Sequence, residues 1–224
     1  MTQSTPPGET ERSEGRLLCR GAEADLVRRE WQGVDAVFKV RLPLKYRLSV
    51  LDDAIRLQRT VREAQMMHAA RRAGLEVPRL LYVDPGEATI VMEHIQGQRV
   101  KDVVGSVPPA EVSRIFHEVG RDAAKLHSSR IVHGDLTTAN MIRRNSSLVY
   151  LDFGLSTFST RVEDFAVDLR LIKETIAGAH AKESSVAFQA LTNGYDAEAG
   201  TKRARAVFTQ LRSIERRGRY ARVV

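Results

Sequence analysis

Two short segments, His133-Gly134-Asp135-Leu136-Thr137-Thr138-Ala139-Asn140 and Asp152-Phe153-Gly154, decide how this chain can fold. Asp135 and Asn140 stand five residues apart, and Asp152 follows Asp135 by 17 residues. The apolar run Leu148-Val149-Tyr150-Leu151 predicts a short strand that brings Asp152 back beside the first segment. Oxygen ligands gathered in this way are the ones that a hard cation such as Mg²⁺ prefers.

Protein kinases arrange the same residue types in the same order. An Asp of the catalytic loop meets the acceptor hydroxyl or a water, and an Asn and a second Asp hold Mg²⁺. The charge of the transferred phosphoryl group has to be neutralised during the reaction. We therefore expect phosphoryl transfer from a nucleotide, with Asp135 as acid/base and with Asn140 and Asp152 as metal ligands.

The composition and the net charge restrict which classes of protein this chain can belong to. The 224 residues are 42% hydrophobic and 28% charged, which is ordinary for a globular protein. The net charge of +7 permits binding of a nucleic acid or of another acidic partner. The single cysteine, Cys19, excludes an internal disulfide, and neither an apolar signal region nor a long apolar run is present. We expect a soluble, cytoplasmic protein that does not enter a membrane.

The first part of the chain is predicted to be rich in sheet. Residues 1–15 lack any apolar period and are expected to be a disordered tail. Residues 16–95 then form a small lobe, in which a long helix at about 50–73 follows the third strand. The five strands of this lobe are expected at residues 17–20, 25–30, 35–40, 80–83 and 88–93.

After a hinge near Ile95–Gly97 the pattern becomes helical. Residues 96–212 are expected to form a reduced helical lobe with helices at about 108–128, 165–176, 183–191 and 198–212. Asn193-Gly194-Tyr195 is interpreted as the break before the last helix, and residues 213–224 as a basic tail without apolar period. The predicted fold is α+β and two-lobed, like that of a protein kinase.

Lys39 and Glu63 complete the ordered set of kinase features. A lysine in the middle of a strand usually faces solvent. Glu63, however, lies in the middle of the next helix, and in kinases a strand lysine clamps the nucleotide phosphates while a helix glutamate holds the lysine. We predict that both residues bind ATP and that Lys39 also serves catalysis.

Three further groups are assigned by position. The turn Gly21-Ala22-Glu23-Ala24 stands where a glycine-rich loop would cover the phosphates. Met92, Glu93 and Ile95 end the second hairpin and are predicted to bind adenine, chiefly through backbone groups, with ordinary strand core as the alternative. Asp168 is either an acid at a helix N-terminus or a buried brace for the catalytic-loop backbone.

Several sequence features of regulated kinases are absent, which indicates a site suited to nucleotide handling and not to binding extended peptide substrates. Gly134 replaces the arginine that would receive an activation-loop phosphate, and no proline follows Pro109. Only 16 residues separate Asp152 from Asp168, too few for a long activation segment. We interpret His133 as a structural residue of the loop.

Over about residues 17–224, the chain resembles one family, which is called the p53-related protein kinase family. Its members are the small atypical kinase and ATPase subunits of the KEOPS tRNA-modification complex. The resemblance rests on residues 21–24, Lys39, residues 59–64, 91–93, 133–140, 152–156 and 163–169, and the arginine-rich end.

The resemblance implies an ATPase and weak Ser/Thr kinase, including autophosphorylation, that supports formation of N6-threonylcarbamoyladenosine at tRNA position 37. It implies ATP and Mg²⁺ as cofactors, with Mn²⁺ as a substitute. It also implies the KEOPS threonylcarbamoyl-transferase subunit and the other small KEOPS subunits as partners. The tail arginines Arg216, Arg217, Arg219 and Arg222 would reach toward the transferase and tRNA, although composition alone predicts a solvated basic end.

Two other interpretations stay open. A small-molecule phosphotransferase of the aminoglycoside or choline type also favours His-Gly-Asp, but such enzymes usually need a larger helical lobe to hold the acceptor. A scaffolding pseudokinase is the second alternative. Against it, Lys39, Asp135, Asn140 and Asp152 are all present.

Overall fold

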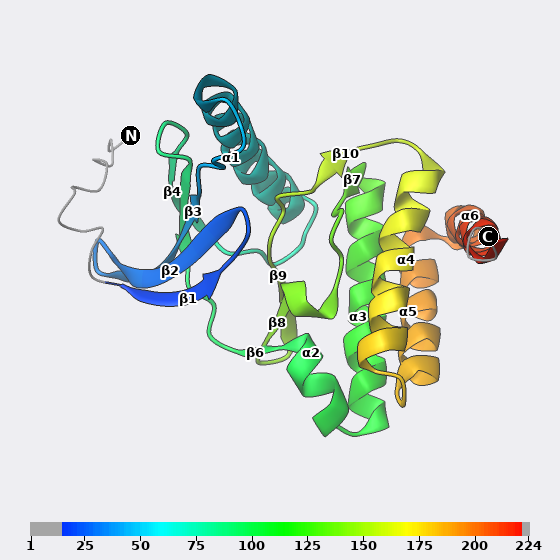
Figure 1. Ribbon diagram of the computed structural model, residues 1–224. Helices are drawn as coiled ribbons and strands as arrows, with labels where there is room; N and C mark the ends of the chain where they lie inside the picture. The colour runs from blue at the N-terminus through cyan, green and yellow to red at the C-terminus, as the bar shows by residue number, and fades with distance from the viewer. Residues whose placement is uncertain (1–14, 221–224) are drawn as a thin grey trace. The chain divides into compact units, whose positions relative to one another are not determined.

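The computed structural model describes residues 15–220, and side chains are described as far as residue 217. The chain divides into two compact units (Figure 1). Unit 1 comprises Met1–Met67 and Pro78–Ile95, and unit 2 comprises His68–Val77 and Gln96–Val224. The segment predicted to be a disordered tail lies, apart from Gly15, outside the described residues.

Unit 1 is built on one antiparallel sheet in the order β1-β2-β3-β5-β4. Its strands are β1 (Arg16–Arg20), β2 (Ala24–Trp31), β3 (Val34–Arg41), β4 (Leu80–Asp84) and β5 (Thr89–Glu93). The long helix α1 (Ser49–Arg72) connects β3 to β4, as predicted from the apolar period. The single cysteine, Cys19, is exposed on β1.

Alternation along β3 gives the sheet two different faces. Ala36 and Phe38 point to one side and join Trp31 and Val91 in a buried apolar cluster. Lys39 and Arg41 point to the other side, and both are buried in spite of their charge. A buried cation has to be paired, so this face must carry an acid as well.

The last part of α1 belongs to unit 2. The segment that follows the helix runs beside β9, where Glu76 forms a parallel bridge with Val149. The amide of Tyr150 also donates to the carbonyl oxygen of Glu76 at 2.9 Å. Residues 68–77, which the sequence pattern placed in the first lobe, are therefore part of the second unit.

Unit 2 is mainly helical (Figure 1). Its main helices are α3 (Pro109–Ser128), α4 (Val162–Ala179), α5 (Ser184–Ala199) and α6 (Thr201–Tyr220). The short elements are β6 (Gln98–Arg99), α2 (Val100–Val103), the 3₁₀ turns η2 (Val104–Ser106) and η3 (Thr138–Asn140), β7 (Ile131–Val132), β8 (Met141–Arg144), β9 (Ser147–Tyr150) and β10 (Thr157–Phe158). The small sheets are β6-β8-β9 and β10-β7.

The expected break at Asn193-Gly194-Tyr195 is wrong, because these residues lie inside α5. Gly194 serves close packing instead: a Cβ there would collide with the carbonyl oxygen of His117 on α3. Gly120 on α3 is its counterpart, since a Cβ there would collide with the carbonyl oxygen of Leu191. The chain breaks later, at Gly200, whose φ of 78° favours glycine.

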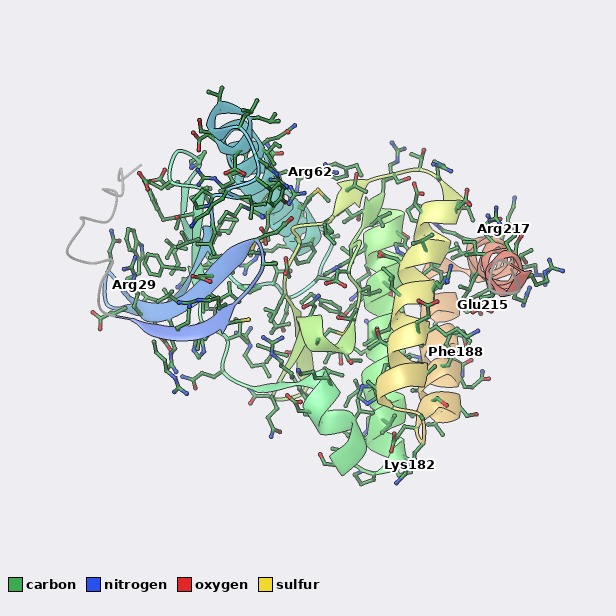
Figure 2. All side chains as sticks on the ribbon, viewed as in Figure 1. Arg29, Arg62, Lys182, Phe188, Glu215 and Arg217 are labelled. Atoms are coloured by element: carbon green, nitrogen blue, oxygen red, sulfur yellow. The ribbon has the colours of Figure 1, made fainter. Side chains whose placement is uncertain are left out.

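The basic tail predicted from residue 213 is also wrong over most of its length, because α6 continues to Tyr220. Ala204, Val207, Leu211 and Ile214 are buried at helical spacing, so the apolar stripe extends past Arg212. Beyond it, Glu215 accepts a bond from Lys173 on α4 at 2.6 Å. Figure 2 labels Glu215 and Arg217 on this helix.

The predicted α+β class is confirmed, with an antiparallel sheet in unit 1 and packed helices in unit 2. Among the described residues, no helix combines the length and the apolar character needed to cross a bilayer.

We predict that Gly120→Ala and Gly194→Ala each lower the free energy of unfolding, by about 1–3 kcal/mol, because the added methyl group must push α3 and α5 apart. Thermal or urea unfolding of the purified variants measures the effect.

Gly178→Ala provides the matched control. Gly178 lies in α4, and a methyl group added there would meet no atom within 4 Å outside the backbone of its own helix. Alanine at this position should therefore be neutral or stabilising by up to about 1 kcal/mol. Equal stability of all three variants would contradict the close approach of α3 and α5.

Candidate active site

In unit 1, Lys39 and Glu63 meet as the sequence predicted. Lys39 Nζ lies 2.7 Å from Glu63 Oε1, and the side chain of Glu63 is only 1% exposed. Strand β3 provides the lysine and the middle of α1 provides the acid. Burial of one charge without the other would be costly, so the pair fixes α1 against the sheet.

Sequence reasoning missed a third member of this group. Arg41 Nη2 lies 2.5 Å from Glu63 Oε2, so the carboxylate holds a separate cation on each oxygen. Arg41 follows Lys39 by two residues and therefore points to the same face of β3. This two-residue spacing was the sequence signal that could have placed Arg41 beside Lys39. We infer that Arg41 positions Glu63 for Lys39.

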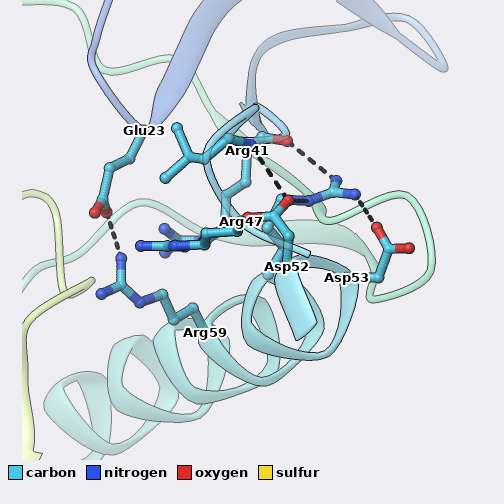
Figure 3. A network of polar contacts seen from close by, with 8 residues as sticks. Glu23, Arg41, Arg47, Asp52, Asp53 and Arg59 are labelled. Atoms are coloured by element: carbon cyan, nitrogen blue, oxygen red, sulfur yellow. Dashed lines mark hydrogen bonds and ion pairs between the residues drawn. The ribbon is translucent and has the colours of Figure 1, made fainter. Parts of the chain in front are cut away.

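The predicted phosphate turn is a tight connection between β1 and β2. The amide of Gly21 donates to the carbonyl oxygen of Ala24 at 3.0 Å, and the amide of Leu42 donates to the carbonyl oxygen of Glu23 at 3.0 Å. The side chain of Glu23 reaches α1, where its Oε2 lies 2.5 Å from Arg59 Nη1 (Figure 3). The turn is thus tied both to the end of β3 and to α1.

The end of β5 carries the residues predicted to bind adenine. The amide of Glu93 donates to the carbonyl oxygen of Arg79 at 2.9 Å, and that of His94 to the carbonyl oxygen of Asp35 at 3.1 Å. Within residues 15–220, the amide of Ile95 has no acceptor. Met92 is half-buried in β5.

In unit 2, Asp135 and Asn140 are joined directly. Asn140 Nδ2 donates to Asp135 Oδ2 at 2.7 Å and to the Asp135 carbonyl oxygen at 3.0 Å. Because the amide nitrogen is turned to Asp135, the side-chain oxygen of Asn140 points elsewhere. The carbonyl oxygen of Asn140 accepts the amide of Leu151 at 2.9 Å, immediately before Asp152. The strand β9 therefore returns Asp152 beside the first segment, as predicted.

Asp152 is held in an unusual backbone conformation, with φ of 57°. Asp tolerates this left-handed region better than most residues. Its Oδ1 accepts the amide of Gly154 at 3.2 Å. Phe153 is fully buried next to the ring of His133, with 4.7 Å between ring centroids, and anchors the segment.

Asp168 is the brace, not a helix-end acid, because it is the seventh residue of α4. Its carboxylate accepts the amides of His133 at 2.6 Å and Gly134 at 2.8 Å. Burial alone would raise the pKa of Asp168, but the hydrogen bond and charge of His127 and the His133 amide outweigh burial and hold the pKa below its ordinary value. The ring of His133 is fully buried, and burial lowers its pKa, in keeping with a structural role.

These residues suit a nucleotide with Mg²⁺. Mg²⁺ usually binds one or two protein oxygens and completes its shell with phosphate and water. The side-chain oxygen of Asn140 and the carboxylate of Asp152 are such donors, and the Asn140 amide nitrogen is kept away by its bond to Asp135.

The tail arginines are only partly described. Arg216 is exposed on α6, and Arg217 donates to Glu163 on α4 at 3.1 Å. The side chain of Arg219 and the whole of Arg222 lie outside the described residues.

Residues 44–177 match the protein kinase domain family. The KEOPS complex subunit Bud32 of Pyrococcus abyssi is 36% identical over 211 residues, which cover 92% of this chain and 96% of that protein. The chain belongs to the Bud32 family of protein kinases. It is accordingly an enzyme of the kinase class.

Two further comparisons extend this assignment. A probable bifunctional tRNA threonylcarbamoyladenosine biosynthesis protein of Methanobrevibacter smithii is 36% identical over 204 residues, covering 91% of this chain but only 36% of that longer protein. The Rio2 kinase of Chaetomium thermophilum, in an ADP/Mg²⁺-phosphoaspartate complex, has a TM-score of 0.62 at 19% identity and covers 90% of this chain and 70% of its own. The Rio2 comparison shows a shared fold.

We predict that Asp168→Asn lowers the free energy of unfolding by about 2–4 kcal/mol, because an amide cannot accept both backbone N–H groups without turning its own N–H₂ toward one of them. The folded-state pKa of Asp168 is depressed. Its stabilisation is therefore present above the unfolded value of about 3.9 and is lost as the pH falls through the folded pKa.

Urea unfolding between neutral pH and about pH 3 measures this difference, which should shrink at the acid end. Asp196→Asn, an exposed carboxylate on α5, is the matched control. Equal stability of Asp168→Asn and Asp196→Asn at neutral pH would contradict the brace.

Proposed function

We propose that this chain is the ATP-dependent kinase and ATPase of a KEOPS-type complex and uses Mg²⁺, with Mn²⁺ able to replace it. The observation that carries the proposal is the buried Lys39–Glu63 pair, together with the Asp135–Asn140 bond beside Asp152.

In unit 1, the residues bind and orient the nucleotide. Lys39 pairs with the phosphates while Glu63, clamped on its other oxygen by Arg41, fixes the direction of the ammonium group. The amide of Ile95 and the carbonyl oxygen of Glu93 hydrogen-bond adenine, since the Ile95 amide has no acceptor among the described residues. Met92 contributes apolar surface.

In unit 2, Asp135 accepts the proton of the attacking hydroxyl or water, and its bond from Asn140 keeps the carboxylate in place. Asn140 and Asp152 would hold Mg²⁺ through their side-chain oxygens. The bound metal would neutralise charge on the phosphoryl oxygens. Asp168 acts indirectly, by fixing the backbone at His133 and Gly134.

The acceptor is proposed to be water in the main, with Ser/Thr hydroxyls, including those of the chain itself, as a weaker alternative. The segment after Asp152 is short and already paired: Thr157 and Phe158 pair with Val132 and Ile131, and α4 begins at Val162. Ser156 Oγ also donates to the carbonyl oxygen of His133 at 2.7 Å. A segment anchored in this way presents no extended platform for a peptide.

The Bud32 relative is named as a KEOPS subunit, and the bifunctional relative as a threonylcarbamoyladenosine biosynthesis protein. We accordingly propose that ATP turnover supports N6-threonylcarbamoyladenosine formation at tRNA position 37, in the cytoplasm. The proposed partners are the transferase subunit, the other small KEOPS subunits and tRNA, with the arginine-rich end facing the transferase and tRNA.

Asp135→Ala and Asp152→Ala should each reduce ATP hydrolysis to less than about one hundredth of the wild-type rate, since one removes the proton acceptor and the other a metal ligand. Phosphate release by the purified variants measures the rate. Asp196→Ala is the control for loss of an exposed acid. Normal turnover by Asp135→Ala or Asp152→Ala would overturn the proposed mechanism.

Removal of residues 216–224 should weaken tRNA binding and flatten its salt dependence, by about 0.7–0.9 in the log–log slope for each lost phosphate contact. ATP binding should not change. Arg205→Gln, which removes an exposed charge from α6 and leaves its end intact, is the control. A salt slope equal to that of the wild type after truncation would exclude this tail from RNA contact.

A further inference from the structure

An acid stands in the turn that is proposed to receive the phosphates. The backbone of Glu23 is fixed, because its carbonyl oxygen accepts the amide of Leu42 while Gly21 closes the turn onto Ala24. The carboxylate is about half exposed. A carboxylate next to a polyphosphate opposes binding, because like charges repel.

Arg59 on α1 pairs with this acid. Its Nη1 lies 2.5 Å from Glu23 Oε2, across 36 residues of sequence (Figure 3). Arg59 precedes Glu63 by one helical turn, so both side chains leave the same face of α1. One face of α1 therefore makes both contacts: Glu63 binds Lys39, and Arg59 binds Glu23 in the turn.

Stability alone does not account for this contact. Both side chains are more than a third exposed, and exposed ion pairs contribute little to folding. The contact does change the charge of the turn. With Arg59 in place the turn is neutral, whereas without Arg59 it carries an uncompensated negative charge.

We propose that Arg59 is a positioning residue for the nucleotide, which neutralises Glu23 and thereby sets the affinity of the turn for polyphosphate. This inference rests on the proposed function, since it takes the nucleotide phosphates to bind at residues 21–24. It predicts that the effect of Arg59 grows with the number of phosphates on the ligand and is transmitted entirely through Glu23.

The experiment is a double-mutant cycle on the full-length protein, with ligand binding measured by calorimetry. The variants are Arg59→Gln, Glu23→Gln and the combination of both, and the ligands are ATP and adenosine in the presence of Mg²⁺. Arg62→Gln is the matched control, because Arg62 is an arginine of the same helix without an ion-pair partner among residues 15–217 (Figure 2).

Arg59→Gln should weaken ATP binding about tenfold, as expected for one carboxylate near several phosphate charges, and leave adenosine binding unchanged. The double variant should return to within about twofold of wild-type ATP affinity. At about 1 M salt, where the Debye length falls to about 3 Å, the deficit of Arg59→Gln should shrink.

Three results would overturn the inference while wild-type protein still binds ATP. These are an ATP affinity of Arg59→Gln equal to that of Arg62→Gln, a double variant as weak as Arg59→Gln, and an equal loss of ATP and adenosine binding. Failure of the wild-type protein itself to bind ATP would instead refute the proposed function.

Discussion

The carboxylate of Asp168 is the contact on which the proposed chemistry of unit 2 depends. It is wholly buried, and it accepts the amides of His133 and Gly134 while His127 donates to it from a neighbouring helix. These bonds set the backbone from which Asp135 projects two residues later. A buried charge with several donors tolerates little displacement, so these bonds restrain the backbone of the loop.

A second buried carboxylate organises unit 1 in the same way. Glu63 accepts one cation on each oxygen, and both cations come from one face of β3. Many kinases move the corresponding helix to switch activity. Here α1 is also bonded near its start, where Arg56 donates to Asp52 and to the carbonyl oxygen of Arg41. Within unit 1, these contacts hold α1 against the sheet without an activating modification.

The sequence was informative where several residue types occur together in an order typical of kinases. The Lys39–Glu63 contact and the proximity of Asp135 to Asn140 could be predicted from that order, and the strands and α1 from the apolar period. Gly194 was misread because a glycine that breaks a helix and one that permits close helix packing look the same without a partner helix. The end of α6 was missed because arginines outnumber its apolar positions. Arg41 was missed because the spacing that puts it on the same face of β3 as Lys39 does not by itself identify its partner, Glu63, 22 residues away.

The exposed Cys19 on β1 has a practical consequence. It is the only thiol in the chain and stands two residues before Gly21, opposite Leu26 of β2. A maleimide dye would therefore attach at one place, beside the turn that carries Glu23, without any engineered cysteine. Fluorescence from that dye would report on the surroundings of this turn in an enzyme that carries no substitution.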